Sequence, residues 1–374
     1  MKIPFFEPLL TNVDKKNVAK SLNQRWLTNG PVLKKFESKI SDFIKTKYSL
    51  GVGSATHALH LSLRSIDISY GDEVIVPTFT FAATANSVIY CGAKPIFTDV
   101  DYETFNINPI EIQKKITKRT KAVIVVHYGG QACNMQEIIS VCKKKGLKLI
   151  EDCAHAFGST YKNRKCGSFG ATGCFSFYPT KIITTGEGGA ISTNNSKLFK
   201  KILLLRSQGL SINSAEREKT GEWEYDIIDL GYNYRMDEIR ASLGLSQMNR
   251  VNQINNQRIK IAQKYNKRLL NIEGITIPKK AENRNHIFHL YTIKIDKNYP
   301  MTRNELNKKL FDAGIGTSVQ YIPLHLMSYY KENFRLSERD YPKANRLYNE
   351  VLCLPIYPKM TNKQTEFVIS KIEK

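Results

Sequence analysis

The feature that most constrains the fold is an alternation of short, β-rich apolar runs with helical patterns between about residues 47 and 192. Segments such as 134–146, with apolar residues at helical spacing, separate the runs. The runs include 73–77, 94–100, 121–128, 147–152 and 174–178. Short buried strands separated by helices are typical of a mostly parallel sheet that helices cover on both faces. We therefore predict an α/β fold.

The rest of the chain favours a smaller α+β domain. We predict a large domain over 1–245, with the N-terminal segment 1–30 included, and a small C-terminal domain over 246–374. The polar stretch 208–223 is predicted to be a mobile surface loop. The elements expected in the second part are a long amphipathic helix over 235–270, β structure at 286–295, and helices near 302–314 and 361–373.

Several classes of protein are disfavoured by composition. No apolar run approaches the roughly 18 residues of a spanning helix, so we expect a soluble protein without a membrane partner. The seven cysteines lack Cys-x-x-Cys spacing, which favours free thiols in a reducing cytoplasm. The net charge of +22 suits a solvated surface, a nucleic-acid site, or attraction of an anionic diphosphate substrate. No nucleic-acid-binding motif supports the second interpretation, and we predict no such partner.

The stretch 150–191 combines residues that could carry chemistry. A predicted strand ends in Asp152, and open α/β sheets bind ligands at the carboxyl ends of their strands. A second apolar run closes with Ser176, and Lys181 follows in a turn rich in glycine and threonine. Chemistry with pyridoxal-5′-phosphate (PLP) needs a lysine amine that forms a Schiff base and a carboxylate that keeps the pyridine nitrogen protonated.

A phosphate cradle is predicted upstream of this stretch. The segment 51–65 passes from a strand through glycines into a helix that opens with Ser54, Ala55 and Thr56. N–H groups at a helix N-terminus bind phosphate, and the aromatic run 78–84 can place a ring against a cofactor. Each feature alone is weak evidence. Asp152 could be a helix cap and Lys181 a solvated lysine, and the loop 51–56 lacks the third glycine of a dinucleotide-binding site. Their order and spacing together favour PLP.

Other polar residues are weaker candidates. The pairs His57/His60 and His286/His289 have no supporting carboxylate or cysteine, so we predict no metal site. Cys153, beside Asp152, is expected to be a packing residue rather than a nucleophile.

Four segments resemble the DegT/DnrJ/EryC1/StrS family of PLP-dependent sugar aminotransferases: 150–159, 176–190, 230–247 and 321–325. The resemblance extends over nearly the whole chain. It implies the fold of type I aminotransferases, with a mostly parallel, seven-stranded sheet in the large domain and a smaller α+β domain. It also implies a homodimer with a shared active site. Relatives in which histidine replaces the lysine are sugar dehydratases, which Lys181 argues against.

The resemblance also implies roles for individual residues. Lys181 would hold the cofactor and move the proton, Asp152 would pair with the pyridine nitrogen, and His155 would lie beside the ring hydroxyl. Phe81 would stack on the ring.

Further residues are implied at the phosphate and on the substrate side. The resemblance implies a cradle of Ala55, Thr56 and Ser176, to which the pattern of the segment 51–65 adds Ser54. Asn233 would reach the phosphate from the neighbouring subunit. The resemblance places Tyr321 and His325 in a substrate-side segment. From its position beside Asn233, Arg235 could either contact a phosphate or cap its helix.

The predicted reaction moves an amino group from an amino acid, L-glutamate, to a keto group of a nucleotide-diphospho-4-keto-6-deoxy sugar for glycan or lipopolysaccharide biosynthesis. The turns 182–189 and 231–239, and the pattern over 321–334, favour C4 as the site and UDP or GDP as the nucleotide. The alternatives are a C3-specific enzyme of the same family and a non-catalytic sensor or nucleic-acid-binding protein. The stereochemistry and the pathway stay open.

Overall fold

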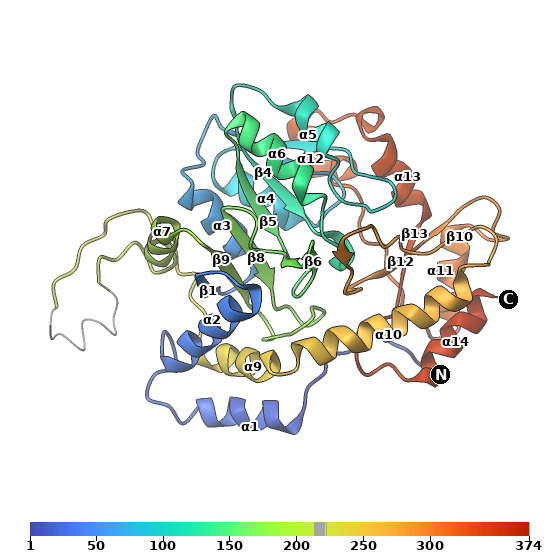
Figure 1. The fold of residues 1–374 in the computed structure, drawn as a ribbon, viewed down its shortest axis with the longest axis horizontal. Helices are drawn as coiled ribbons and strands as arrows, with labels where there is room; N and C mark the ends of the chain where they lie inside the picture. The colour runs from blue at the N-terminus through green and yellow to red at the C-terminus, as the bar shows by residue number, and fades with distance from the viewer. Residues whose placement is uncertain (213–220, 222, 374) are drawn as a thin grey trace.

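A seven-stranded sheet lies at the centre of the computed structural model, which describes residues 1–212, 221 and 223–373 (Figure 1). The strand order is β1-β9-β8-β5-β4-β2-β3. Neighbours from β8 to β3 are parallel, whereas β9 is antiparallel to both β1 and β8. The predicted mostly parallel sheet is therefore confirmed. The strands are β1 (Tyr48–Val52), β2 (Glu73–Pro77), β3 (Lys94–Thr98), β4 (Thr120–Val126), β5 (Lys148–Asp152), β8 (Thr172–Ser176) and β9 (Gly189–Thr193).

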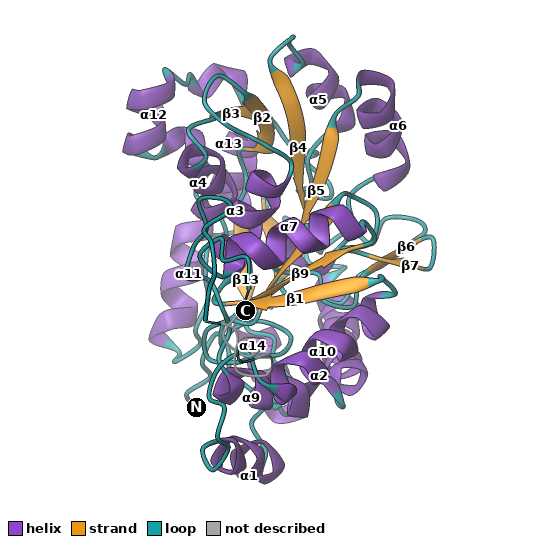
Figure 2. Cartoon of the chain, turned by 90° about the vertical axis from the view of Figure 1, so that its left-hand side faces the viewer, coloured by secondary structure: helices purple, strands orange, loops and turns teal. Residues whose placement is uncertain are grey.

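Helices cover both faces of this sheet because successive strand residues point to opposite sides. In β2, for example, Val74 and Val76 belong to one apolar core and Ile75 to the other. Figure 2 shows α3 and α4 on one side of β4 and β5, with α5 and α6 on the other. The helices that flank the sheet are α2 (Pro31–Ile44), α3 (Ala55–Ser65), α4 (Ala82–Tyr90), α5 (Pro109–Lys115), α6 (Met135–Lys145) and α7 (Ser196–Arg206).

The helix predicted over 235–270 is two helices, α9 (Glu238–Met248) and α10 (Val251–Leu269). The break at residues 249–250 coincides with a long-range ion pair, in which the guanidinium of Arg250 lies 2.7 Å from the carboxylate of Asp14. Asp14 belongs to α1 (Asn12–Ser21), which packs against α9 below the sheet in Figure 1.

The C-terminal part has its own apolar core around the sheet β10-β12-β13 and includes α14, which packs on α10. Ile3 belongs to this core too, so the first residues, predicted to be part of the large domain, pack with the C-terminal part. Both termini lie close together there (Figure 1). The elements are β10 (Ile275–Thr276), β12 (Tyr291–Ile295), α11 (Arg303–Asp312), η2 (Leu324–Leu326), α12 (Ser328–Phe334), η3 (Glu338–Asp340), α13 (Pro342–Glu350), β13 (Val351–Leu354) and α14 (Asn362–Ile372).

The β structure predicted at 286–295 begins only at Tyr291. Just before it, the N–H groups of Ile287 and Leu290 donate to the carbonyls of Gly130 and Gly129. These glycines belong to a single 3-10 turn, η1 (Tyr128–Gly130), at the end of β4. A third small sheet consists of β6 (Thr160–Tyr161), β7 (Arg164–Lys165) and β11 (Arg284–Asn285).

Most of the loop predicted over 208–223 lies outside the described residues. Within the part of the chain that is described, no helix has both the length and the apolar character that crossing a bilayer requires.

Candidate active site

A cavity of about 450 Å³ lies at the carboxyl ends of three neighbouring strands, β4, β5 and β8, and beside the N-terminus of α3. Its volume falls within the range of roughly 300–1,000 Å³ that is usual for small-molecule sites. The structure brings together nine of the residues predicted from the sequence. The nine are Ser54, Ala55, Thr56, Phe81, Asp152, His155, Ser176, Lys181 and Tyr321.

Lys181 reaches the cavity from the turn that follows β8. The turn is closed by a hydrogen bond from the Lys181 N–H to the Tyr178 carbonyl at 2.9 Å. Burial lowers the pKa of the Lys181 amine to about 8, although the nearby charge of Asp152 acts in the opposite direction. About a tenth of the amine is therefore unprotonated and nucleophilic at pH 7, far more than for an ordinary lysine.

Asp152 is the last residue of β5, and the residue is only 5% exposed. One oxygen accepts the Ala154 N–H at 3.1 Å, and the other accepts the Thr84 hydroxyl at 2.9 Å. Burial raises the pKa of the Asp152 carboxyl, while these two hydrogen bonds and the charge of Lys181 lower it. The side chain is thus held in one orientation from both sides.

His155 lies three residues beyond Asp152. Its Nδ1 accepts the N–H of Gly129 at 3.3 Å, and its Nε2 lies 2.9 Å from the phenol oxygen of Tyr321. Because Nδ1 is an acceptor, the proton resides on Nε2. Burial lowers the pKa of His155 well below its usual range, so the ring is neutral.

The N-terminus of α3 lines another part of the cavity. Ser54 caps the helix by accepting the N–H of His57 at 3.2 Å. The N–H groups of Ala55 and Thr56, in the same first turn, have no intrahelical carbonyl to bind. Gly189 allows β9 to approach closely, since a Cβ there would lie 2.7 Å from the Ala55 nitrogen. These features fit PLP: a cradle for its phosphate, an amine for its aldehyde and a carboxylate for its ring nitrogen.

Three predicted residues do not line the cavity of this chain. Asn233 is exposed and its backbone pairs with Ser207, and the backbone of Arg235 pairs with Val52. His325 was placed on the substrate side by resemblance, but its ring is fully buried. Its two ring nitrogens lie 2.8 Å from the Thr78 hydroxyl and 2.7 Å from the side-chain oxygen of Asn345, so both are engaged within the protein.

The structure adds residues that sequence reasoning missed. Thr84 holds the Asp152 carboxylate, and Thr80 lies 2.9 Å from Thr84 through their hydroxyls. The signal was available, because both threonines belong to the run 78–84 and are four residues apart. Other cavity residues, among them Tyr178, Glu187 and Gln320, carry no comparable pattern in the sequence.

Comparisons with known proteins found a matching family, similar sequences and similar solved structures. The model of the DegT/DnrJ/EryC1/StrS aminotransferase family matches residues 8–373. The spore coat polysaccharide biosynthesis protein SpsC of Bacillus subtilis is 39% identical over 99% of this chain and 96% of its own. GDP-perosamine synthase of Escherichia coli O157:H7 is 36% identical over 99% of this chain and 97% of its own. The solved structure of the PLP form of a Streptococcus pneumoniae protein assigned as a sugar aminotransferase superimposes with a TM-score of 0.93. It is 30% identical, and the match covers 100% of this chain and 98% of that chain.

Proposed function

Because this chain belongs to the DegT/DnrJ/EryC1/StrS aminotransferase family of PLP-dependent transaminases, we propose that it aminates the C4 keto group of a nucleotide-diphospho-4-keto-6-deoxy sugar. The proposed donor is L-glutamate, the nucleotide UDP or GDP, and the product a precursor of surface glycans. The observation that carries the assignment is one cavity that holds the Lys181 amine, the Asp152 carboxylate and the N-terminus of α3.

PLP, when bound, supplies a ring that withdraws electrons from the carbon bearing the amino group. The chain's own part begins with Lys181, whose amine has a pKa of about 8. Such an amine can bind covalently when unprotonated, and once released it can take a proton from one carbon and return it to another. Asp152, held by Thr84 and Ala154, would keep a proton on the ring nitrogen because a fixed anion favours the charged form.

His155 and α3 would orient the cofactor. The Nε2–H of His155 donates to the Tyr321 hydroxyl and lies in the cavity wall. There the ring hydroxyl of PLP could compete with Tyr321 for this hydrogen bond. The free N–H groups of Ala55 and Thr56, together with the Ser176 hydroxyl, would bind the phosphate without a buried cation.

The sugar substrate is supported by the relatives. SpsC is named for polysaccharide biosynthesis, and the name GDP-perosamine synthase denotes formation of a GDP-linked sugar. The C4 position rests on the sequence of the turns 182–189 and 231–239, and the basic balance of the chain suits a diphosphate ligand.

A shared site in a homodimer is supported by exposure at the mouth of the cavity. Phe81 and Tyr178, which line it, are 61% and 46% exposed, so the wall that they form ends at solvent in a single chain. A second copy would cover these rings and could bring its own Asn233, which is exposed. All seven cysteines are free and buried, which supports a reducing compartment such as the cytoplasm.

Turnover on defined substrates tests the proposal. The enzyme is incubated with glutamate, PLP and either a 4-keto or a 3-keto nucleotide sugar, and NMR locates the new amine. We expect amination at C4, and no product with the Lys181→Ala variant. Product only at C3 would instead support the C3-specific alternative, and conversion of simple keto acids alone would refute a sugar substrate.

A further inference from the structure

The residue before Asp152 is a second buried carboxylate that the proposed chemistry leaves unused. Glu151 is 0% exposed and, as its neighbour in β5, points to the opposite face of the sheet. The cavity therefore contains Asp152 but not Glu151. A buried carboxylate beside the residue that faces the cofactor needs partners, and the structure supplies four.

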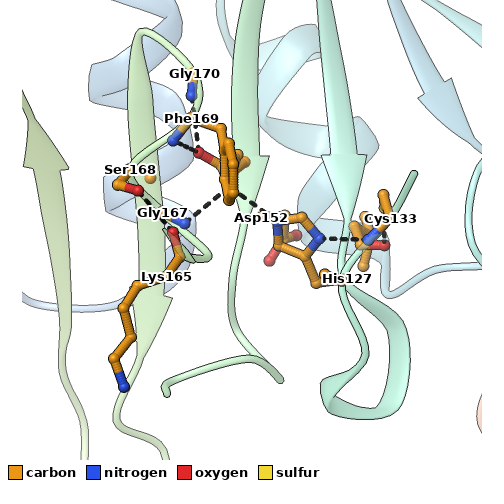
Figure 3. A network of polar contacts seen from close by, with 12 residues as sticks. His127, Cys133, Asp152, Lys165, Gly167, Ser168, Phe169 and Gly170 are labelled. Atoms are coloured by element: carbon orange, nitrogen blue, oxygen red, sulfur yellow. Dashed lines mark hydrogen bonds and ion pairs between the residues drawn. The ribbon is translucent and has the colours of Figure 1, made fainter. Parts of the chain in front are cut away.

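Glu151 receives three backbone N–H groups from one turn. Oε1 accepts those of Phe169 and Gly170 at 2.7 and 2.8 Å, and Oε2 accepts that of Gly167 at 2.8 Å. The fourth partner is Nε2 of His127, 3.0 Å from Oε2. Figure 3 shows His127 and the turn 167–170 on either side of the strand that ends at Asp152.

His127 links the same network to the next strand. It follows β4, is fully buried, and its Nδ1 accepts the Cys133 N–H at 3.0 Å (Figure 3). The proton therefore resides on Nε2, which donates to Glu151. The backbone N–H of His127 donates to the carbonyl of Asp152 itself at 3.1 Å.

We propose that Glu151 and His127 are positioning residues for Asp152. Together they tie the carboxyl ends of β4 and β5 to the turn 167–170, so that the backbone of Asp152 cannot shift relative to the cavity. On the other face, Thr84 and Ala154 hold the Asp152 side chain. The inference rests on the proposed role of Asp152 at the ring nitrogen.

A metal site at the same place is a different interpretation. Ligand atoms of His127, Glu151 and Cys153 lie within 4.8 Å of one another. Yet both imidazole nitrogens and both carboxylate oxygens already make hydrogen bonds within the protein. Binding of an ion would require breaking several of them, and the hydrogen-bonded arrangement is complete without it.

The test compares Glu151→Gln with Glu73→Gln in the PLP-loaded enzyme. In Glu151→Gln, an amide NH₂ replaces one oxygen and faces N–H groups, which disturbs the end of β5. The control, Glu73, is a 2% exposed carboxylate at the amino end of β2, where it accepts from Thr117 and Arg119. Like Glu151, Glu73 is buried and lies in a strand of the central sheet. It is at the amino end of its strand, far from the carboxyl ends that line the cavity.

For Glu151→Gln we expect kcat to fall about 10- to 100-fold, as small misplacements of catalytic groups do, with the KM for the donor changed less than about threefold. The absorbance of bound PLP should titrate at a higher pH than in the wild type, because a less protonated ring makes the attached nitrogen more basic. Glu73→Gln should lower the melting temperature but leave kcat and the titration unchanged.

If Glu151 has a purely structural role, Glu151→Gln and Glu73→Gln should lower the melting temperature equally and leave kcat and the PLP titration as in the wild type. That result would overturn the proposal. If Glu151→Gln fails to fold, His127→Leu and His127→Gln replace it. The Leu variant should show the same titration shift, and the Gln variant, which can still donate to Glu151, should restore part of the difference. Equal behaviour of the two, with a wild-type titration, would also overturn it.

Asp152→Asn, measured in parallel, separates two failures. If it leaves kcat and the titration unchanged, the assignment of Asp152 to the ring nitrogen is wrong and the positioning role falls with it. If it changes both and Glu151→Gln changes neither, only the positioning role is wrong.

Discussion

The phenol oxygen of Tyr321 lies 2.9 Å from Nε2 of His155 and so connects the segment before α12 to the wall of the cavity. Burial raises the pKa of the Tyr321 phenol and lowers that of the His155 ring, so both are neutral. Because Nδ1 of His155 accepts the Gly129 N–H, its proton lies on Nε2, so the histidine is the donor and the phenol oxygen the acceptor. A cofactor hydroxyl that enters the cavity meets a neutral N–H rather than an imidazolium.

Replacing Tyr321 by Phe should weaken this arrangement. The His155 N–H loses its acceptor, and a buried unsatisfied donor costs about 1–3 kcal/mol. We expect a lower melting temperature of the cofactor-free protein and a roughly tenfold higher PLP affinity, because the ring hydroxyl no longer competes with Tyr321 for the His155 proton; thermal unfolding and absorbance titration measure the two effects. Tyr329→Phe, at a 53% exposed tyrosine on α12, is the control and should behave as the wild type. Equal melting temperatures and equal PLP affinities of the two variants would show that the contact has no role.

Lys181→Ala should abolish the absorbance of covalently held PLP and steady-state transamination, since no other amine lines the described cavity. PLP can still bind through its phosphate, so affinity should fall without vanishing. The matched control is Lys165→Ala, a partly buried lysine whose amine lies over the ring of Phe43. Near-normal turnover by Lys181→Ala would refute its assignment.

The pKa of Lys181 predicts a pH dependence for cofactor capture. In the cofactor-free protein, the amine is mostly protonated and unreactive below its pKa of about 8. The rate of covalent capture should thus rise about tenfold per pH unit below 8 and level off above it. Stopped-flow absorbance measures the rate. A rise that continues toward pH 10, as for a model lysine peptide, would contradict the lowered pKa.

Asp152→Asn should bind PLP but lose most of the rate, because an amide cannot supply the negative charge. Thr84→Val, which removes one hydrogen bond to the carboxylate, should lose about tenfold, consistent with about 1.5 kcal/mol for a bond to a charged group. Both are measured as single-turnover rates. An unaffected Asp152→Asn enzyme would mean that another carboxylate holds the ring.

Mixed subunits test the shared site. If Asn233 acts across the interface, Lys181→Ala and Asn233→Ala subunits are each inactive, yet a hybrid dimer carries one intact site. Mixing them, with exchange followed by mass spectrometry, should restore up to about a quarter of wild-type activity at full random exchange. A fully active monomer in sedimentation would rule out the shared site.

The sequence alone determined the strand-helix alternation and much of the cavity. Asp152 and Ser176 end apolar runs, and Ser54 opens a helix after a glycine, so local patterns place them at the carboxyl edge of the sheet. Lys181 follows the second run in a turn rich in glycine and threonine, whereas Tyr321 came from the family resemblance alone, and the structure brings both to the same cavity. Local hydrogen bonding and strand periodicity act over a few residues, which is why a sequence can reveal them.

Tertiary structure decided what depends on partners far apart in the chain. The predicted helix breaks where Arg250 meets Asp14, and His325 turns inward because Thr78 and Asn345 occupy its nitrogens. The first residues join the C-terminal core through Ile3. Each of these outcomes depends on a contact between segments that are far apart in the chain. The packing of the whole chain brings such segments together, and no local sequence pattern encodes the contact.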